Sequence, residues 1–236
     1  MKEVIMKKSL FWMVLIVGIV ALLGSCAKKD ESTAAAAGDV AGTGTTASGT
    51  IAGTSVTGTY HTSWYGETPA GGCVDNSSAI STYGFPSDTK SFKQEWIVTG
   101  TSTYTMSLIT YSDETCSTMT SYFNQMYENV TVGSELTGLT AGSSPSKPTT
   151  ASKFSSVEDQ YVLMANTTAT VAYFLSQYEQ TMTSGTEMVI DEESPVTQYG
   201  LAATETVSGN LWLFIKRNIS TAYNVTDWSG GNSYWQ

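Results

Sequence analysis

The chain is 236 residues long, a length that suits one domain or two small ones. It carries 21 acidic residues against 11 basic ones, and the formal net charge is -10. Binding to nucleic acid or to an anionic membrane face through charge is therefore excluded as a leading function, and we expect no nucleic-acid partner.

Residues 1–25 have the layout of a secretory signal peptide. Lysines near the start precede an uncharged apolar run over residues 10–23, which is short for a permanent transmembrane helix. The run leads into Leu-Gly-Ser-Cys at residues 23–26, which resembles the lipobox of bacterial lipoproteins. This resemblance implies a lipid on Cys26 that anchors the protein in the cell envelope. Because no aspartate follows Cys26, it also implies the outer membrane.

After the cysteine, the chain is rich in Ala, Gly, Ser and Thr up to residue 55 and contains Gly-Thr repeats. Such a segment cannot bury enough apolar surface to offset the entropy of ordering it. We predict a disordered tether over residues 26–55 and one folded domain over residues 56–236.

Two cysteines remain once Cys26 is assigned to the lipid. In an oxidising compartment Cys73 and Cys116 are expected to pair, and neither lies in a Cys-x-x-Cys motif. We predict a structural disulfide between them, with two free thiols or a redox pair as the alternative.

The folded part is dominated by alternating apolar and polar residues, which favours β-strands. The expected strands span residues 57–65, 92–98, 104–109, 119–132, 161–165, 187–191, 201–207 and 211–216, with a last strand or a covering loop in the C-terminal tail. The turn-rich residues 133–150 predict a hairpin or an exposed loop.

The period changes at residues 169–182. Val171, Phe174 and Tyr178 recur at steps of three and four, which indicates a helix that Gly185 could end, with a strand as the alternative. About eight or nine strands and one short helix are the inventory of a single small antiparallel β-barrel.

The start of the domain resembles the lipocalin and wider calycin barrels. Gly58-Thr59-Tyr60 is similar to their Gly-x-Trp strand, with tyrosine in place of tryptophan. Such barrels place a late arginine across that aromatic ring. Arg217, the only arginine, follows the strong late strand and matches that position, so the resemblance implies that Gly58, Tyr60 and Arg217 close the barrel.

A closer likeness is to lipocalin-like domains of the APCDD type. They show a cysteine soon after the first strand and later a Tyr-x-Asp-x-x-Cys segment, which here correspond to Cys73 and residues 111–116. The resemblance implies a lipocalin-like barrel with a Cys73–Cys116 bridge and a pocket for an apolar ligand.

The sequence contains no recognisable catalytic motif. His61 is the only histidine, and no Gly-x-Ser-x-Gly elbow is present. A zinc site needs clustered histidines or cysteines, and the carboxylates at residues 191–193 do not follow the spacing of a calcium loop. We expect no enzyme activity, no cofactor and no metal. Two carboxylates that converge in a cleft would be the alternative.

Four large side chains fall on strand faces that would line a barrel interior: Trp64, Trp96, Tyr104 and Met106. They either give an apolar ligand its contact area or fill a dry core. The leading hypothesis is a monomeric envelope lipoprotein that binds a small apolar ligand. The alternative is an adhesion or protein-interaction module with a filled barrel and long contacting loops.

Overall fold

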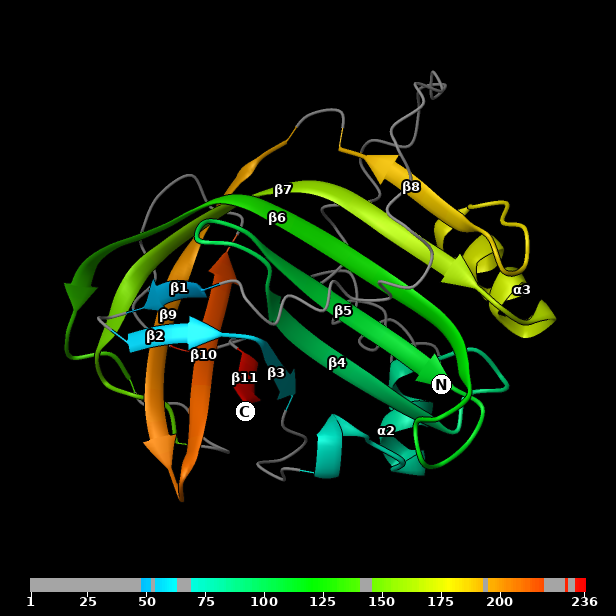
Figure 1. The fold of residues 1–236 in the computed structure, drawn as a ribbon, viewed down its shortest axis with the longest axis horizontal. Helices are drawn as coiled ribbons and strands as arrows, with labels where there is room; N and C mark the ends of the chain where they lie inside the picture. The colour runs from blue at the N-terminus through cyan, green and yellow to red at the C-terminus, as the bar shows by residue number, and fades with distance from the viewer. Residues whose placement is uncertain are drawn as a thin grey trace, which may run out of the picture. The chain divides into compact units, whose positions relative to one another are not determined.

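The computed structural model describes residues 48–51, 54–62, 69–140, 146–192, 195–218, 228 and 232–236. It is mainly antiparallel β-structure with two α-helices (Figure 1). The strands are β1 (Ser48–Ile51), β2 (Thr54–Thr57), β3 (Thr59–Thr62), β4 (Ser91–Val98), β5 (Tyr104–Tyr111), β6 (Met119–Leu136), β7 (Ala151–Ala165), β8 (Glu187–Asp191), β9 (Thr197–Val207), β10 (Asn210–Asn218) and β11 (Asn232–Trp235). The helices are α2 (Ser77–Tyr83) and α3 (Thr168–Tyr178), and a 3₁₀ turn, η1, spans Ala70–Gly72.

Eight strands form a continuous hydrogen-bonded ring in the order β3, β4, β5, β6, β7, β9, β10, β11 and back to β3. One edge of β7 pairs with β6, and two strands share the other edge. Along that second edge, β9 pairs with the N-terminal half of β7 and β8 pairs with its C-terminal half. β8 therefore lies outside the ring. β1 and β2 pair with each other as a separate hairpin.

Alternate residues along the strands point into the ring and form its main core. Trp96, Tyr104 and Tyr127 on β4, β5 and β6 share this core with Leu213 and Ile215 of β10. The opposite faces of β9 and β10 carry a second apolar cluster, which includes the buried Trp228. These two strands are thus apolar on both faces, unlike a strand with one solvated side.

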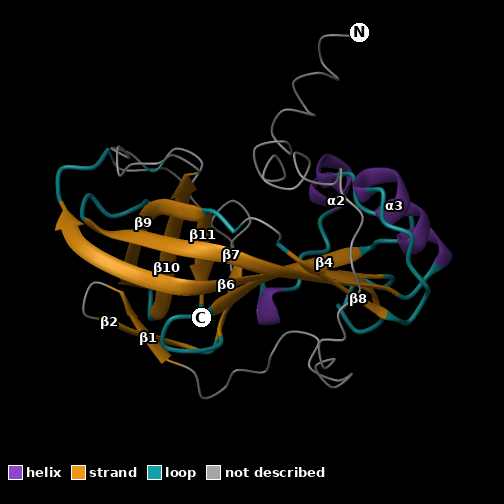
Figure 2. Cartoon of the chain, turned by 90° about the horizontal axis from the view of Figure 1, so that it is seen from above, coloured by secondary structure: helices purple, strands orange, loops and turns teal. Residues whose placement is uncertain are grey.

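The two helices pack against the same end of β4, β5 and β6 (Figure 2). Ala79 of α2 lies in a cluster with Phe92 of β4, and Tyr178 of α3 stacks on Phe123 of β6 with ring centroids 5.6 Å apart. The β1–β2 hairpin packs at the other end of these strands, against Val98. The interior therefore has a helical end and a hairpin end.

Local capping explains where the helices begin and end. The Asn76 side chain accepts the N–H groups of Ser78 and Ala79 and starts α2, which Gly84 ends in the left-handed conformation. The Thr167 hydroxyl accepts the N–H of Thr170 and starts α3.

Several sequence-based expectations differ from the structure, in which the described residues form eleven strands rather than eight or nine. The described residues form two α-helices rather than one, because α2 is capped at both ends although its Ser- and Thr-rich sequence has low helix propensity. The predicted helix over residues 169–182 stops at Tyr178, because Glu179 turns left-handed with φ 56°. β1 lies inside residues 26–55, the predicted tether, because Ile51 finds an apolar partner in the main core.

Candidate functional site

An apolar cavity of about 350 Å³ lies at the hairpin end of the ring. The volume is within the range of natural small-molecule sites, at its lower end. Its walls come from the hairpin, from β4 and β5 with the turn between them, from β6 and from β7. The lining residues are Ile51, Val56, Trp96, Val98, Gly100, Thr101, Thr103, Tyr104, Val130, Val132 and Phe154.

The β1–β2 hairpin supplies one wall. Ile51 and Val56 are buried and line the cavity, whereas Ser55 and Thr57 on the other face of β2 are exposed. The hairpin is joined to β3 by Gly58, whose φ of 75° lies in the left-handed region that favours glycine.

A bulge in β6 supplies another wall. The register between β6 and β7 shifts between Glu128 and Thr131, and Asn129 has a φ of 52°. Asparagine tolerates this left-handed conformation better than most residues. The shift leaves Val130 out of the ladder and places it in the lining of the cavity.

The cavity ends on a stack of aromatic rings. Trp96 and Tyr104 lie with centroids 3.7 Å apart, and Tyr104 and Tyr127 follow at 4.5 Å. The guanidinium carbon of Arg217 lies 4.9 Å from the centroid of the Tyr127 ring, a cation–π arrangement. Three neighbouring strands and β10 thus build a four-layer stack across the ring interior.

A closed cycle of polar side chains lies beside this stack. Arg217 donates to the hydroxyl of Tyr127, which donates to Oε1 of Glu158 at 3.1 Å. Oε2 of Glu158 accepts from Nε2 of Gln198 at 2.8 Å, and Oε1 of Gln198 lies 3.5 Å from Nη1 of Arg217. Gln125 adds a further donor to Glu158 at 3.0 Å. The half-buried Arg217 and the buried Glu158 are therefore linked through neutral side chains.

Burial raises the pKa of the tyrosines in this region further above neutral pH. Loss of water raises the pKa of Tyr104 and of Tyr127 well above the ordinary value, and the carboxylate of Glu158 adds to the effect. The Tyr104 hydroxyl is 2.9 Å from Oγ of Ser156, so its polar atom is also satisfied. Near neutral pH both rings are uncharged.

The predicted ligand-binding residues divide into three groups. Trp96 and Tyr104 line the cavity. Met106 is buried in the same core and is not among the lining residues. Trp64 lies outside the described residues, as does the predicted lipidated Cys26.

The predicted ring-closing residues occupy different places. Arg217 covers Tyr127 of β6, whereas Tyr60 of β3 pairs in register with Trp96. Gly58 forms the turn between the hairpin and β3. Tyr60 is fully buried in the main core.

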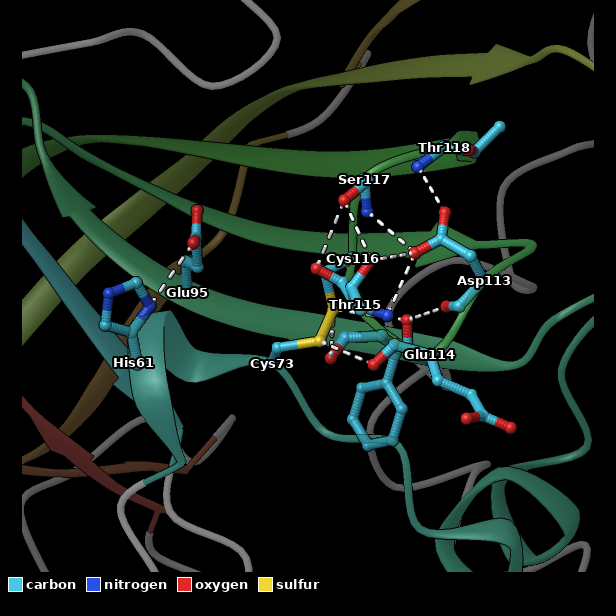
Figure 3. The surroundings of a disulfide bond; sticks show 11 residues. His61, Cys73, Glu95, Asp113, Glu114, Thr115, Cys116, Ser117 and Thr118 are labelled. Carbon is cyan, nitrogen blue, oxygen red and sulfur yellow. Dashed lines mark hydrogen bonds and ion pairs between the residues drawn. A yellow bond between two sulfur atoms is a disulfide. The ribbon is translucent and has the colours of Figure 1, made fainter.

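The structure joins Cys73 and Cys116 in a disulfide, at the end of β4 and β5 away from the cavity (Figure 3). Cys116 has a φ of 53° in a loop that Asp113 holds together. Oδ1 of Asp113 accepts from N and Oγ1 of Thr115 at 2.9 Å and 2.7 Å, and Oδ2 accepts from the N–H of Thr118 at 2.5 Å. Burial, with help from two nearby carboxylates, raises the pKa of Tyr111 to about 12.

His61 lies on the outer face near this disulfide. Its Nδ1 is 3.2 Å from Oε1 of Glu95, as Figure 3 shows, and its ring is 5.6 Å from that of Trp235. Gly72 packs so closely on the imidazole that a Cβ there would overlap it.

The described residues contain no cluster of three potential metal ligands. Among the residues that the structure describes, no helix is both long and apolar enough to span a membrane.

Sequence reasoning missed Val130, Phe154 and Glu158. Phe154 and Glu158 point inward in phase, but the register shifts at Asp159 so that Tyr161 points inward next. A prediction that followed the alternation back from Tyr161 would therefore place Phe154 and Glu158 on the outer face.

Comparison of the sequence with models of known protein families and with curated proteins finds no match.

Proposed function

We propose that the strand ring is a lipocalin-like barrel that binds one small apolar molecule in the cavity at its hairpin end. The cavity itself carries this proposal, because most of its lining residues are apolar and its volume falls within the range of small-molecule sites, at the lower end. The aromatic rings of Trp96, Tyr104 and Phe154 offer large contact area, and the aliphatic side chains around them add further apolar surface.

Fluorescence titration with the neutral probe N-phenylnaphthylamine tests the proposal. We expect saturable binding by the wild-type protein, with one probe per chain. Val130→Phe adds bulk to the cavity wall at a half-buried position, and we expect it to weaken binding at least about tenfold. Val196→Phe makes the same change at an exposed position outside the cavity and should leave binding unchanged. Equal binding by both variants would contradict the proposal.

We further propose that the protein is exported and anchored through a lipid on Cys26. The lipobox-like sequence at residues 23–26 supports this location. The pairing of the other two cysteines also supports it, because disulfides persist in oxidising compartments. Mass spectrometry of the mature chain from the membrane fraction is the test. An unmodified Cys26, or a mature chain that starts elsewhere, would reject the anchor.

A second candidate function is interaction with a protein partner through the outer surface. The filled middle of the ring favours it, since the aromatic stack and the polar cycle occupy that region. The loop after β6 gives it less support. Leu139 in this loop is buried in the outer apolar cluster, and Trp228 in that cluster donates to the carbonyl of Pro148. Absence of probe binding by the wild-type protein would favour this second function.

A further inference from the structure

We infer that the cavity takes an uncharged amphiphile, such as a long-chain alcohol, and discriminates against carboxylates and ammonium ions with the same chain. This inference rests on the proposed function and names the ligand class of the same site. It is drawn from the distribution of charge and of hydroxyl groups around the cavity.

The cavity wall carries no charge. None of its lining residues is acidic or basic, and aliphatic or aromatic side chains from six strands make up most of it. A charged head group at the partly exposed mouth of this site would lose part of its hydration and gain no opposite charge from the lining. A neutral hydroxyl or ester loses far less.

The nearest interior charges are already engaged. Arg217 lies over the Tyr127 ring and donates to its hydroxyl, and Glu158 accepts from three side chains. The rings of Tyr104 and Tyr127 stack between this cycle and Trp96. Arg217 is not part of the cavity lining, so it offers no direct partner for a carboxylate.

The rim of the cavity offers hydroxyl groups. Thr101 and Thr103 come from the turn between β4 and β5, with Thr101 exposed and Thr103 half-buried. The Thr103 hydroxyl is 3.0 Å from that of Thr99, which leaves further lone-pair capacity, since a hydroxyl has one donor and two acceptor sites. A neutral polar head would lie at this rim, with its chain directed toward Trp96 and Phe154.

Competition among ligands with one chain and three heads tests the inference. Decanol, decanoate and decyltrimethylammonium are titrated against the wild-type protein with bound N-phenylnaphthylamine near neutral pH. We expect decanol to displace the probe at concentrations at least about tenfold lower than either charged compound, because partial dehydration costs a charged head more than a hydroxyl and the lining offers no opposite charge.

A charge introduced at the rim supplies a gain-of-function test. Val132 lines the cavity and is 37% exposed, so Val132→Lys can keep its ammonium in water while reaching the rim. We expect this variant to bind decanoate at least about tenfold more tightly than the wild type and to raise the ratio of decanoate affinity to decanol affinity above that of the wild type and of the uncharged control. Val132→Met is the uncharged control. Thr101→Lys makes the same test at an exposed turn position if the strand variant folds poorly.

The outcomes separate the inference from the proposed function. Probe binding with decanoate or decyltrimethylammonium competing as well as decanol would overturn the ligand class and leave the binding function intact. The ligand class is likewise overturned if neither lysine variant gains affinity for decanoate. If neither probe nor decanol binds the wild-type protein, the proposed function fails and the ligand class fails with it.

Discussion

Asp113 organises the loop that presents Cys116 to Cys73. Its carboxylate accepts hydrogen bonds from the side chain of Thr115 and from three backbone N–H groups within the next five residues. These bonds, of which the one from the Thr115 hydroxyl has the largest effect, hold the pKa of Asp113 below its usual range. The Tyr-x-Asp-x-x-Cys pattern in the sequence thus has a physical basis, because the aspartate caps the turn that leads to the cysteine.

The lowered pKa predicts a pH dependence. A carboxyl with a lower pKa in the folded state adds stability above its unfolded-state pKa, and this is lost as the pH falls through the folded value. Asp113→Asn should therefore lower the melting temperature near neutral pH, and the gap to the wild type should narrow below about pH 4. Thermal melts across an acid pH series measure the gap, with the exposed Glu114→Gln as control. A gap that stays constant with pH would contradict this role.

Gly200 is required where β9 runs between β7 and β10. It pairs with Phe154 on one side and with Arg217 on the other, and a Cβ there would overlap the carbonyl oxygen of Lys216. Because backbone cannot yield as a flexible side chain does, we expect Gly200→Ala to lower the free energy of unfolding by about 3 kcal/mol.

Urea denaturation measures that cost, and Gly133 provides the matched control in β6. A Cβ at Gly133 would lie 3.4 Å from Cβ of Lys153, an ordinary contact. Gly133→Ala should be neutral or stabilise by up to about 0.5 kcal/mol, since alanine loses less backbone entropy than glycine. A similar loss in both variants would mean that the close approach at Gly200 is not the cause.

At the scale of elements, the β1–β2 hairpin is the part of the cavity wall that is least bound to the rest. Its two strands pair only with each other among the described strands, and such an isolated hairpin is marginally stable in water. Gln236 donates to the carbonyl of Thr57 at 2.8 Å, and Ile51 and Val56 pack on the core. These contacts are few, so we expect the hairpin to open without unfolding the ring.

A pair of truncations tests this independence. Leu213→Ala in β10 should cost about 2–5 kcal/mol, as expected for a large side chain removed from a packed core. Ile51→Ala should cost less than about 1 kcal/mol, because global unfolding starts from a state in which the hairpin can already be detached. Both side chains are buried, so burial alone would predict similar losses. Hydrogen exchange at residues 48–57 as slow as in β4 and β5 would argue against the open state.

At the scale of the whole molecule, the sequence predicts the mainly β class and most strands well, for a physical reason. Period-two alternation reports one buried face, and β4, β5, β8 and β10 lie close to the predicted ranges. The prediction from alternation fails where a bulge changes which residues of a strand point inward. β7 starts ten residues before the predicted strand, because the bulge at Asp159 reverses which residues point inward.

The candidate site was predictable only in part. Trp96 and Tyr104 follow from alternation within two strands, and both line the cavity. Phe154 and Val130 depend on which strands become neighbours and on the bulges between them, information that lies in long-range pairing. The place of Arg217 over Tyr127 likewise follows from closing the ring, not from local pattern.

The disulfide links parts of the ring that the hydrogen-bond ladder joins only indirectly. Cys73 follows η1, which packs on β3 and β4, and Cys116 lies in the loop between β5 and β6. Among the described residues, Val74 and Phe92 form an isolated bridge that fixes the same segment to β4. The bond therefore holds the segment that leads into α2 against the sheet.

Replacing both cysteines by serine should lower the free energy of unfolding by about 4 kcal/mol, the chain-entropy value for a loop closed across a sequence separation of 43. Urea denaturation of the double variant and of the wild type, each with and without reductant, measures the loss. Reductant should destabilise the wild type by a similar amount and leave the variant unchanged, because only the wild type has a bond to lose. If thiol labelling of the denatured, unreduced wild type modifies Cys73 and Cys116, the native protein lacks the bond and this stability difference should vanish.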